Sequence, residues 1–132
     1  TVPKYYNTSY EKSKHLYGLN LNGKKIVDTN SVVIVEGPFD VITLHQCGVP
    51  AVALLGTTFS KEQAVLLRRY TDSLTIWLDQ DTAGKNAANN VVNLTKQYFY
   101  TKMVETNETE KDDVSDIYVK YGREKVMEYL ND

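Results

Sequence analysis

The 132-residue sequence has little of what several common protein classes require. It contains one cysteine, Cys47, and two histidines, and these residues form no Cys/His zinc-binding pattern. A single cysteine forms no internal disulfide, so Cys47 is expected to be a small core residue in a reducing compartment. No window reaches the roughly 18 to 20 uninterrupted apolar residues of a membrane helix, and no secretory leader opens the sequence. We therefore expect a cytoplasmic protein without zinc and without a membrane partner.

A strong net charge is also missing. Lys and Arg total 15 and Asp and Glu total 17, which gives a net charge of −2, so total charge does not indicate a strongly basic nucleic-acid binder. Residues 1–30, however, carry five lysines against two acids, a local charge of +3 beside an acidic remainder. Such an arrangement can combine phosphate contacts with metal-binding carboxylates, although an ordinary solvated surface is the simpler interpretation.

Short apolar runs alternate with helical patterns from residue 31 onward. Strands are expected over 31–35, 51–55, 74–78 and 102–105. Helices are expected over 38–47, from a Ser60/Gln63 capping box to about residue 70, and over 83–100, 113–120 and 124–130. Strands that are apolar on both faces indicate an α/β fold with a mostly parallel sheet of about four strands flanked by helices.

Residues 1–30 show little sustained periodicity. They are expected to form an extended N-terminal arm with short elements, followed by the main domain over residues 31–132. The apolar and aromatic side chains that would dock this arm on the body are Tyr5, Tyr6, Leu16, Tyr17, Leu19 and Leu21.

Carboxylates follow two of the expected strands. Glu36 comes after the first strand, and Asp79 and Asp81 come after the third. The carboxyl ends of parallel strands meet at one edge of a sheet, where ligands bind. If the first and third strands are neighbours, these acids face each other and repel unless a cation lies between them. Oxygen ligands without His or Cys suit Mg²⁺ or Mn²⁺ rather than zinc.

Simpler structural roles remain open for several charged residues near these strand ends. Asp81 and Asp113 have the spacing of helix N-caps, and Asp40 suits a solvated position in the first turn of a helix. Lys85 lies at an expected helix start, where a cation opposes the helix dipole. That cost makes a phosphate-binding role for Lys85 more attractive.

Several motifs, in order, resemble a known family. The segments VIVEGPFDV (33–41), AVALLGTT (51–58) and DQDTAGKNAA (79–88) resemble the Toprim fold, which primases, topoisomerases and some nucleases share. The segments PKYYNT (3–8) and LYGL (16–19) resemble the region that precedes Toprim in bacterial DnaG-type primases. KDDVSDI (111–117) resembles the tail motif of the same primases. The resemblance extends over nearly the whole chain.

This resemblance implies a role for each matching residue. Catalytic roles fall on Glu36, Asp79 and Asp81. Metal binding is implied for the same three acids and for Asp40 and Asp113, the latter in place of a plain capping role. Contacts with nucleic acid or nucleotide phosphates are implied for Lys4, Tyr5 and Asn7, to which the dipole argument adds Lys85. Three positions depart from the family: Gln80 replaces a usual Gly, Val114 a usual Pro, and Ser115 a frequent Asp, which bears on the number of metals bound.

The resemblance further implies a nucleotidyltransferase that depends on Mg²⁺ or Mn²⁺. It would join ribonucleoside triphosphates into short RNA primers on single-stranded DNA, in a bacterium or as a phage protein. A replicative helicase would bind through regions outside these residues, and we expect the chain alone to prime weakly or not at all. The alternatives are a Toprim nuclease or topoisomerase-like enzyme, a non-catalytic module that binds metal and nucleic acid, and a receiver-like phospho-acceptor domain.

Overall fold

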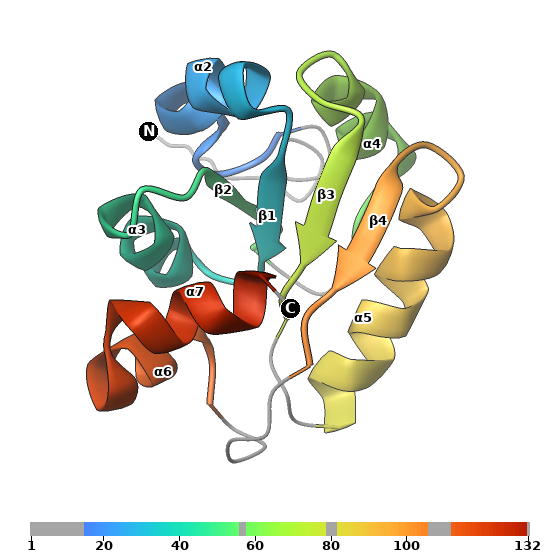
Figure 1. Cartoon of the computed structure of the whole chain (residues 1–132). Helices are drawn as coiled ribbons and strands as arrows, with labels where there is room; N and C mark the ends of the chain where they lie inside the picture. The colour runs from blue at the N-terminus through green and yellow to red at the C-terminus, as the bar shows by residue number, and fades with distance from the viewer. Residues whose placement is uncertain (1–14, 56–57, 79–81, 106–111, 132) are drawn as a thin grey trace, which may run out of the picture.

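A four-stranded parallel sheet forms the centre of the protein. The computed structural model describes residues 15–55, 58–78, 82–105 and 112–131, without the side chains of 82–85 and 87. The strands lie in the order β2-β1-β3-β4 (Figure 1). They are β1 (Val32–Val35), β2 (Ala51–Ala53), β3 (Ser73–Ile76) and β4 (Tyr100–Met103), and every neighbouring pair is parallel. In the register of β1 and β3, Ile34 lies opposite Ile76.

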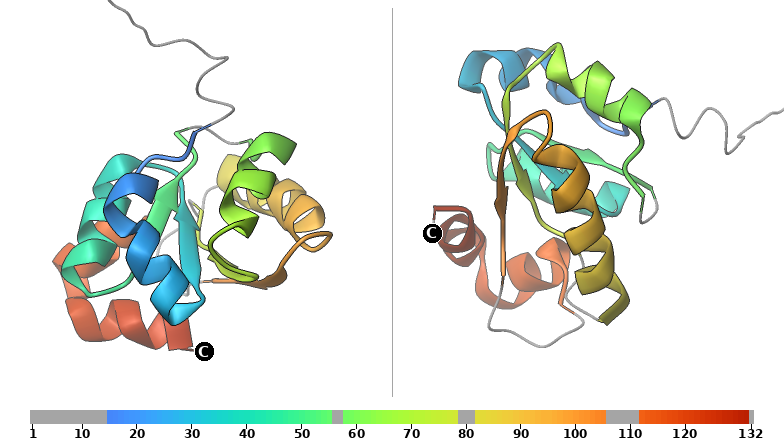
Figure 2. Two further views of the ribbon diagram at one scale, coloured as in Figure 1. Left: turned by 90° about the horizontal axis from the view of Figure 1, so that it is seen from above. Right: turned by 90° about the vertical axis from the view of Figure 1, so that its right-hand side faces the viewer.

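The sheet is covered by helices on both faces. The helices are α2 (Leu19–Thr29), α3 (Pro38–Gln46), α4 (Lys61–Arg68), α5 (Thr82–Thr95), α6 (Val114–Tyr121) and α7 (Arg123–Asn131). One face packs against α2, α4 and α5, and the other packs against α3, α6 and α7. Figure 2 shows the resulting three layers from the side, with α5 and the pair α6 and α7 on opposite sides of the sheet.

The alternation of side chains along each strand divides the core into two parts. Ile34 and Ile76 point to the first face, and Val33, Val35 and Trp77 point to the second. All five are at most 5% exposed. Both faces of β1 are therefore buried, as the apolar run in the sequence predicts for a central parallel strand. Burial of each such side chain contributes about 1.5–3 kcal/mol.

Most of the expected elements are confirmed, with shifted ends. The four expected strands are all present, and the Ser60/Gln63 capping box begins α4 as predicted. Gly122 separates α6 from α7. The largest difference is that α5 ends at Thr95 rather than near residue 100, whereas no strand end differs by more than two residues. Cys47 is a core residue, as expected, and Trp77 is buried as well.

Helix α2 is an element that the sequence analysis did not identify within residues 1–30. Its buried positions, Leu19, Asn22, Gly23 and Ile26, have helical spacing, but two of them are not hydrophobic, so the pattern is hidden. Leu16 and Leu19 are buried as expected, whereas Tyr17 and Leu21, which we expected to dock, are 42% and 60% exposed. Tyr5 and Tyr6 lie outside the described residues.

Asn22 is a polar side chain that is buried in this core. It is 1% exposed, and its Nδ2 donates a 2.8 Å hydrogen bond to the carbonyl oxygen of Ala51 on β2. A buried amide that is hydrogen-bonded in this way fixes α2 against the edge strand. Within the ranges that the structure describes, none of the helices has the length and apolar character that crossing a bilayer requires.

Candidate active site at the carboxyl edge of the sheet

The acids that follow the first and third strands were expected to face each other if these strands are neighbours. The strands β1 and β3 are adjacent and parallel, so this condition is met. The pairing extends past the last residues of β3, because the backbone N–H of Trp77 donates to the carbonyl oxygen of Ile34 at 2.8 Å. Continuing the register by two residues from Ile34 and Ile76 places Glu36 opposite Leu78. Leu78 directly precedes Asp79 in the sequence.

Several predicted site residues lie outside the part of the chain that is described. These are Asp79, Asp81, Lys4, Tyr5 and Asn7, and the side chain of Lys85 is likewise not described. Their proximity to Glu36 therefore stays a prediction. In the described ranges alone, no group of three or more Asp, Glu, His or Cys side chains has the arrangement of a metal site. A site of the predicted kind requires the carboxylates that follow β3.

Glu36 lies where β1 passes into α3. Its carbonyl oxygen accepts a 3.0 Å hydrogen bond from the backbone N–H of Leu55, which has a positive φ of 58°. A left-handed backbone costs about 1–2 kcal/mol for a residue other than glycine, and such strain is concentrated at functional sites. Beside Glu36, a Cβ added to Gly37 would meet no atom of the described residues within 4 Å. The described part of the chain therefore does not crowd the backbone after Glu36.

Asp40 is buried rather than solvated. It lies in the first turn of α3 and is 5% exposed. Its Oδ1 accepts hydrogen bonds from the Oγ of Ser115 at 2.9 Å and from the backbone N–H of Ser115 at 3.2 Å. Because Ser115 is in the first turn of α6, the N-termini of two helices meet at this carboxylate. Their partial positive charges are favourable beside an anion.

Asp113 caps α6, as its spacing predicted. Its Oδ1 accepts a 2.8 Å hydrogen bond from the backbone N–H of Asp116, and Asp116 Oδ2 accepts from the backbone N–H of Asp113 at 3.2 Å. Burial raises the pKa of the Asp113 carboxyl, and the hydrogen bond from the backbone of Asp116 acts in the opposite direction. The capping role occupies one carboxylate oxygen, and metal binding by Asp113 stays a prediction.

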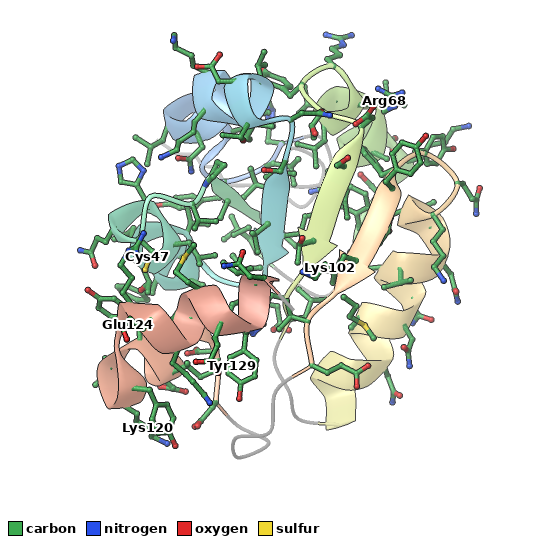
Figure 3. The ribbon with its side chains drawn as sticks, in the orientation of Figure 1. Cys47, Arg68, Lys102, Lys120, Glu124 and Tyr129 are labelled. Atoms are coloured by element: carbon green, nitrogen blue, oxygen red, sulfur yellow. The ribbon has the colours of Figure 1, made fainter. Side chains whose placement is uncertain are left out.

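Asp112 is a buried acid to which the sequence analysis gave no role. It is 4% exposed, and its Oδ1 accepts a 2.9 Å hydrogen bond from Lys120 Nζ. This hydrogen bond raises the pKa of Lys120, whose side chain extends from α6 at the end of the molecule that also carries Tyr129 (Figure 3). The ion pair fixes the chain that leads into α6. In the sequence, the only sign of this ion pair is that Asp112 comes eight residues before Lys120.

Phe39 is a second residue that the sequence analysis did not single out. Phe39, Val41 and Leu44 are all apolar residues of α3, and Val41 and Leu44 are fully buried. Phe39 is instead 77% exposed. Phe39 lies in the sequence between Glu36 and Asp40, so a solvent-exposed aromatic ring belongs to the segment that carries both acids. Its position in the first turn of the helix that follows Glu36 is the signal that could have found it.

The fold and the motifs at this edge define a Toprim-type domain. The chain belongs to the Toprim-like family, whose profile matches residues 33–118. It is similar to the DNA primase of Synechococcus elongatus, with 42% identity over 110 residues. The matched region is 78% of this chain and 16% of that protein, so the chain spans a small part of the relative's length.

Solved primase structures have the same fold. The zinc-binding and RNA polymerase domains of the Aquifex aeolicus primase match with a TM-score of 0.79 and 28% identity, over 91% of this chain and 30% of that one. The catalytic domain of a DnaG primase bound to single-stranded DNA matches with a TM-score of 0.76 and 28% identity, over 91% of this chain and 39% of that one. The resemblance to DnaG-type primases, found in the motifs, is confirmed.

Proposed function

We propose that this chain is the Toprim part of the catalytic core of a DnaG-type primase, a nucleotidyltransferase that makes short RNA primers on single-stranded DNA. The observation that carries the proposal is that β1 and β3 are adjacent and parallel, which supports a common edge for Glu36 and the acids that follow β3 in the sequence. The similarity to primases supports the choice of reaction, and the matching DnaG structure bound to single-stranded DNA supports the choice of template.

The donor set at this edge fits a hard divalent cation. Carboxylate oxygens without His or Cys are typical ligands of Mg²⁺ and Mn²⁺. We assign the metal-binding role to Glu36, Asp79 and Asp81, with Asp40 and Asp113 as further acids beside them. Bound metal would supply charge stabilisation for the attacking and leaving oxygens of phosphoryl transfer.

The chain's own residues would bind and orient the substrates. A triphosphate would lie beside Glu36, where no described residue would crowd a Cβ at Gly37. The exposed ring of Phe39 offers a face on which a nucleobase can stack. Lys85 follows the start of α5, where the helix N-terminus also favours phosphate. Lys4, Tyr5 and Asn7 would track the nucleic-acid backbone, with an affinity that falls as salt rises.

The remaining partners follow from the reaction. Ribonucleoside triphosphates are the substrates, and a replicative helicase would contact regions of a primase other than these 132 residues. We expect the reaction to take place in the cytoplasm, either of a bacterium or of the host of a phage. We propose no zinc site in these 132 residues, because the sequence has no Cys/His zinc-binding pattern.

A priming assay tests this function. A longer protein that carries this chain within a primase core is expected to lose primer synthesis when Asp79 is replaced (Asp79→Ala). Asp72→Ala is the matched control, because Asp72 precedes β3 and therefore lies at the amino ends of the strands, away from the proposed site. Priming at the wild-type level by Asp79→Ala would exclude the metal role. Cleavage of single-stranded DNA with Mg²⁺ and no ribonucleotides would favour the nuclease alternative.

A further inference from the structure

Ser115 joins two helices that are far apart in the sequence. Its Oγ and its backbone N–H both donate to Oδ1 of Asp40, which is 75 residues away. The Oγ of Ser115 also lies 3.0 Å from Thr43 Oγ1, one turn further along α3. One serine at the start of α6 therefore contacts two side chains on a single face of α3.

Ser115 and its partner Asp40 are both close in sequence to predicted site residues. Asp40 comes four residues after Glu36, and Ser115 comes two residues after Asp113. The hydrogen bonds from Ser115 to Asp40 thus tie the acids that follow β1 to the acid that caps α6. The hydrogen bonds between Ser115 and Asp40 involve none of the residues that follow β3.

We propose that Ser115 is a positioning residue for the metal-binding carboxylates. The inference rests on the proposed function, because it assigns Ser115 to the same site. Carboxylates that converge on one point repel each other, and a charge-assisted hydrogen bond from a hydroxyl holds one of them in a fixed direction. Ser115 keeps Asp40 and the start of α6 against the edge where Glu36 lies, so that the acids are arranged before a cation arrives.

The expected effect of removing this hydroxyl is on metal affinity rather than on the fold. Partners that orient metal ligands typically change metal affinity 10- to 100-fold when they are lost. Ser115→Ala keeps the backbone N–H that donates to Asp40, so we expect the lower end, about a tenfold loss. Ser115→Thr restores a hydroxyl at the same place and should restore most of the affinity.

The experiment measures Mn²⁺ binding to the 132-residue chain. Electron paramagnetic resonance gives free Mn²⁺ during a titration, and the fluorescence of Trp77, the single tryptophan and two residues before Asp79, gives a second readout. The matched control is Ser60→Ala, which removes a serine from the start of α4 on the other face of the sheet. Urea unfolding of each variant confirms that it is folded at the conditions of the titration.

The proposal expects weaker Mn²⁺ binding in Ser115→Ala, recovery in Ser115→Thr and wild-type affinity in Ser60→Ala. Equal affinity of Ser115→Ala and the wild type would overturn it, as would a Ser115→Thr variant no better than Ser115→Ala. Failure of the wild type itself to bind Mn²⁺ is a different result, because it is shared by every variant. That result would overturn the metal centre of the proposed function and the positioning role together.

Discussion

Two glycines with similar backbone angles allow steric clash to be separated from backbone strain. Gly18, the N-cap of α2, has φ +92°, and Gly48, which follows α3, has φ +80°. A Cβ on Gly18 would lie 2.9 Å from Val41 Cγ1 and 3.0 Å from the carbonyl oxygen of Ala51. Among the described residues, a Cβ on Gly48 would have only the flexible Lys25 Nζ nearby, at 3.7 Å. Alanine at either position is strained, and at Gly18 it also collides with packed atoms.

The expected losses of stability follow from these contacts. A positive φ costs an alanine about 1–2 kcal/mol at both positions. Overpacking at Gly18 adds about 1–3 kcal/mol, since Val41 is fully buried and cannot move aside. Gly48→Ala should therefore lower the free energy of unfolding by about 1–2 kcal/mol and Gly18→Ala by about 2–5 kcal/mol.

Urea denaturation followed by circular dichroism measures this difference. For a domain of this size, the extra loss in Gly18→Ala corresponds to a midpoint lower than that of Gly48→Ala by about 1 M urea. Equal midpoints for the two variants would contradict the close packing of α2 against β2 and α3. A lower midpoint for Gly48→Ala than for Gly18→Ala would contradict it more strongly.

Three further predictions concern other parts of the molecule. Phe39→Leu should weaken binding of single-stranded DNA or of ribonucleotides about tenfold in filter-binding assays, while Tyr100→Leu, an equally exposed aromatic at the opposite sheet edge, should not; equal affinities would exclude stacking on Phe39. Ser60→Ala should cost about 1 kcal/mol in urea unfolding, because α4 loses its cap; an unchanged midpoint would refute this. Hydrogen bonds from Asn30 and then Ser73 lower the pKa of Asp72. The ionised Asp72 carboxylate therefore stabilises the folded state at neutral pH, and this contribution is lost as the pH falls through the lowered pKa. Urea titrations should show Asp72→Asn less stable than the wild type at pH values above that pKa, and equally stable below it.

The elements that the sequence predicts well are those whose signal is local. The strands β1 and β3 are β-branched runs bounded by breakers, and the box at Ser60 and Gln63 begins α4 by contacts within four residues. Helix α2 escaped prediction because its core positions include Asn22, whose burial depends on a hydrogen bond to Ala51, 29 residues away. A long-range partner of this kind leaves no local pattern.

The same distinction applies to the site. The position of Glu36 at a strand end and the capping spacing of Asp113 are readable from the sequence. The burial of Asp40 is not, because it depends on donors from Ser115 on another helix. The exposure of Phe39 is not readable either, because a 3.6-residue period does not show which apolar residue of a short helix stays uncovered. Exposure of that ring is a property of the assembled layers.

The account rests on a cation bound between the acids that follow β1 and β3. The most direct measurement is the anomalous scattering of Mn²⁺ from crystals of the chain grown or soaked with the ion. We expect an anomalous peak within bonding distance of carboxylate oxygens of Glu36, Asp79 and Asp81. Ordered carboxylates of Asp79 and Asp81 that point away from Glu36, with no peak between them in saturating Mn²⁺, would contradict the central claim.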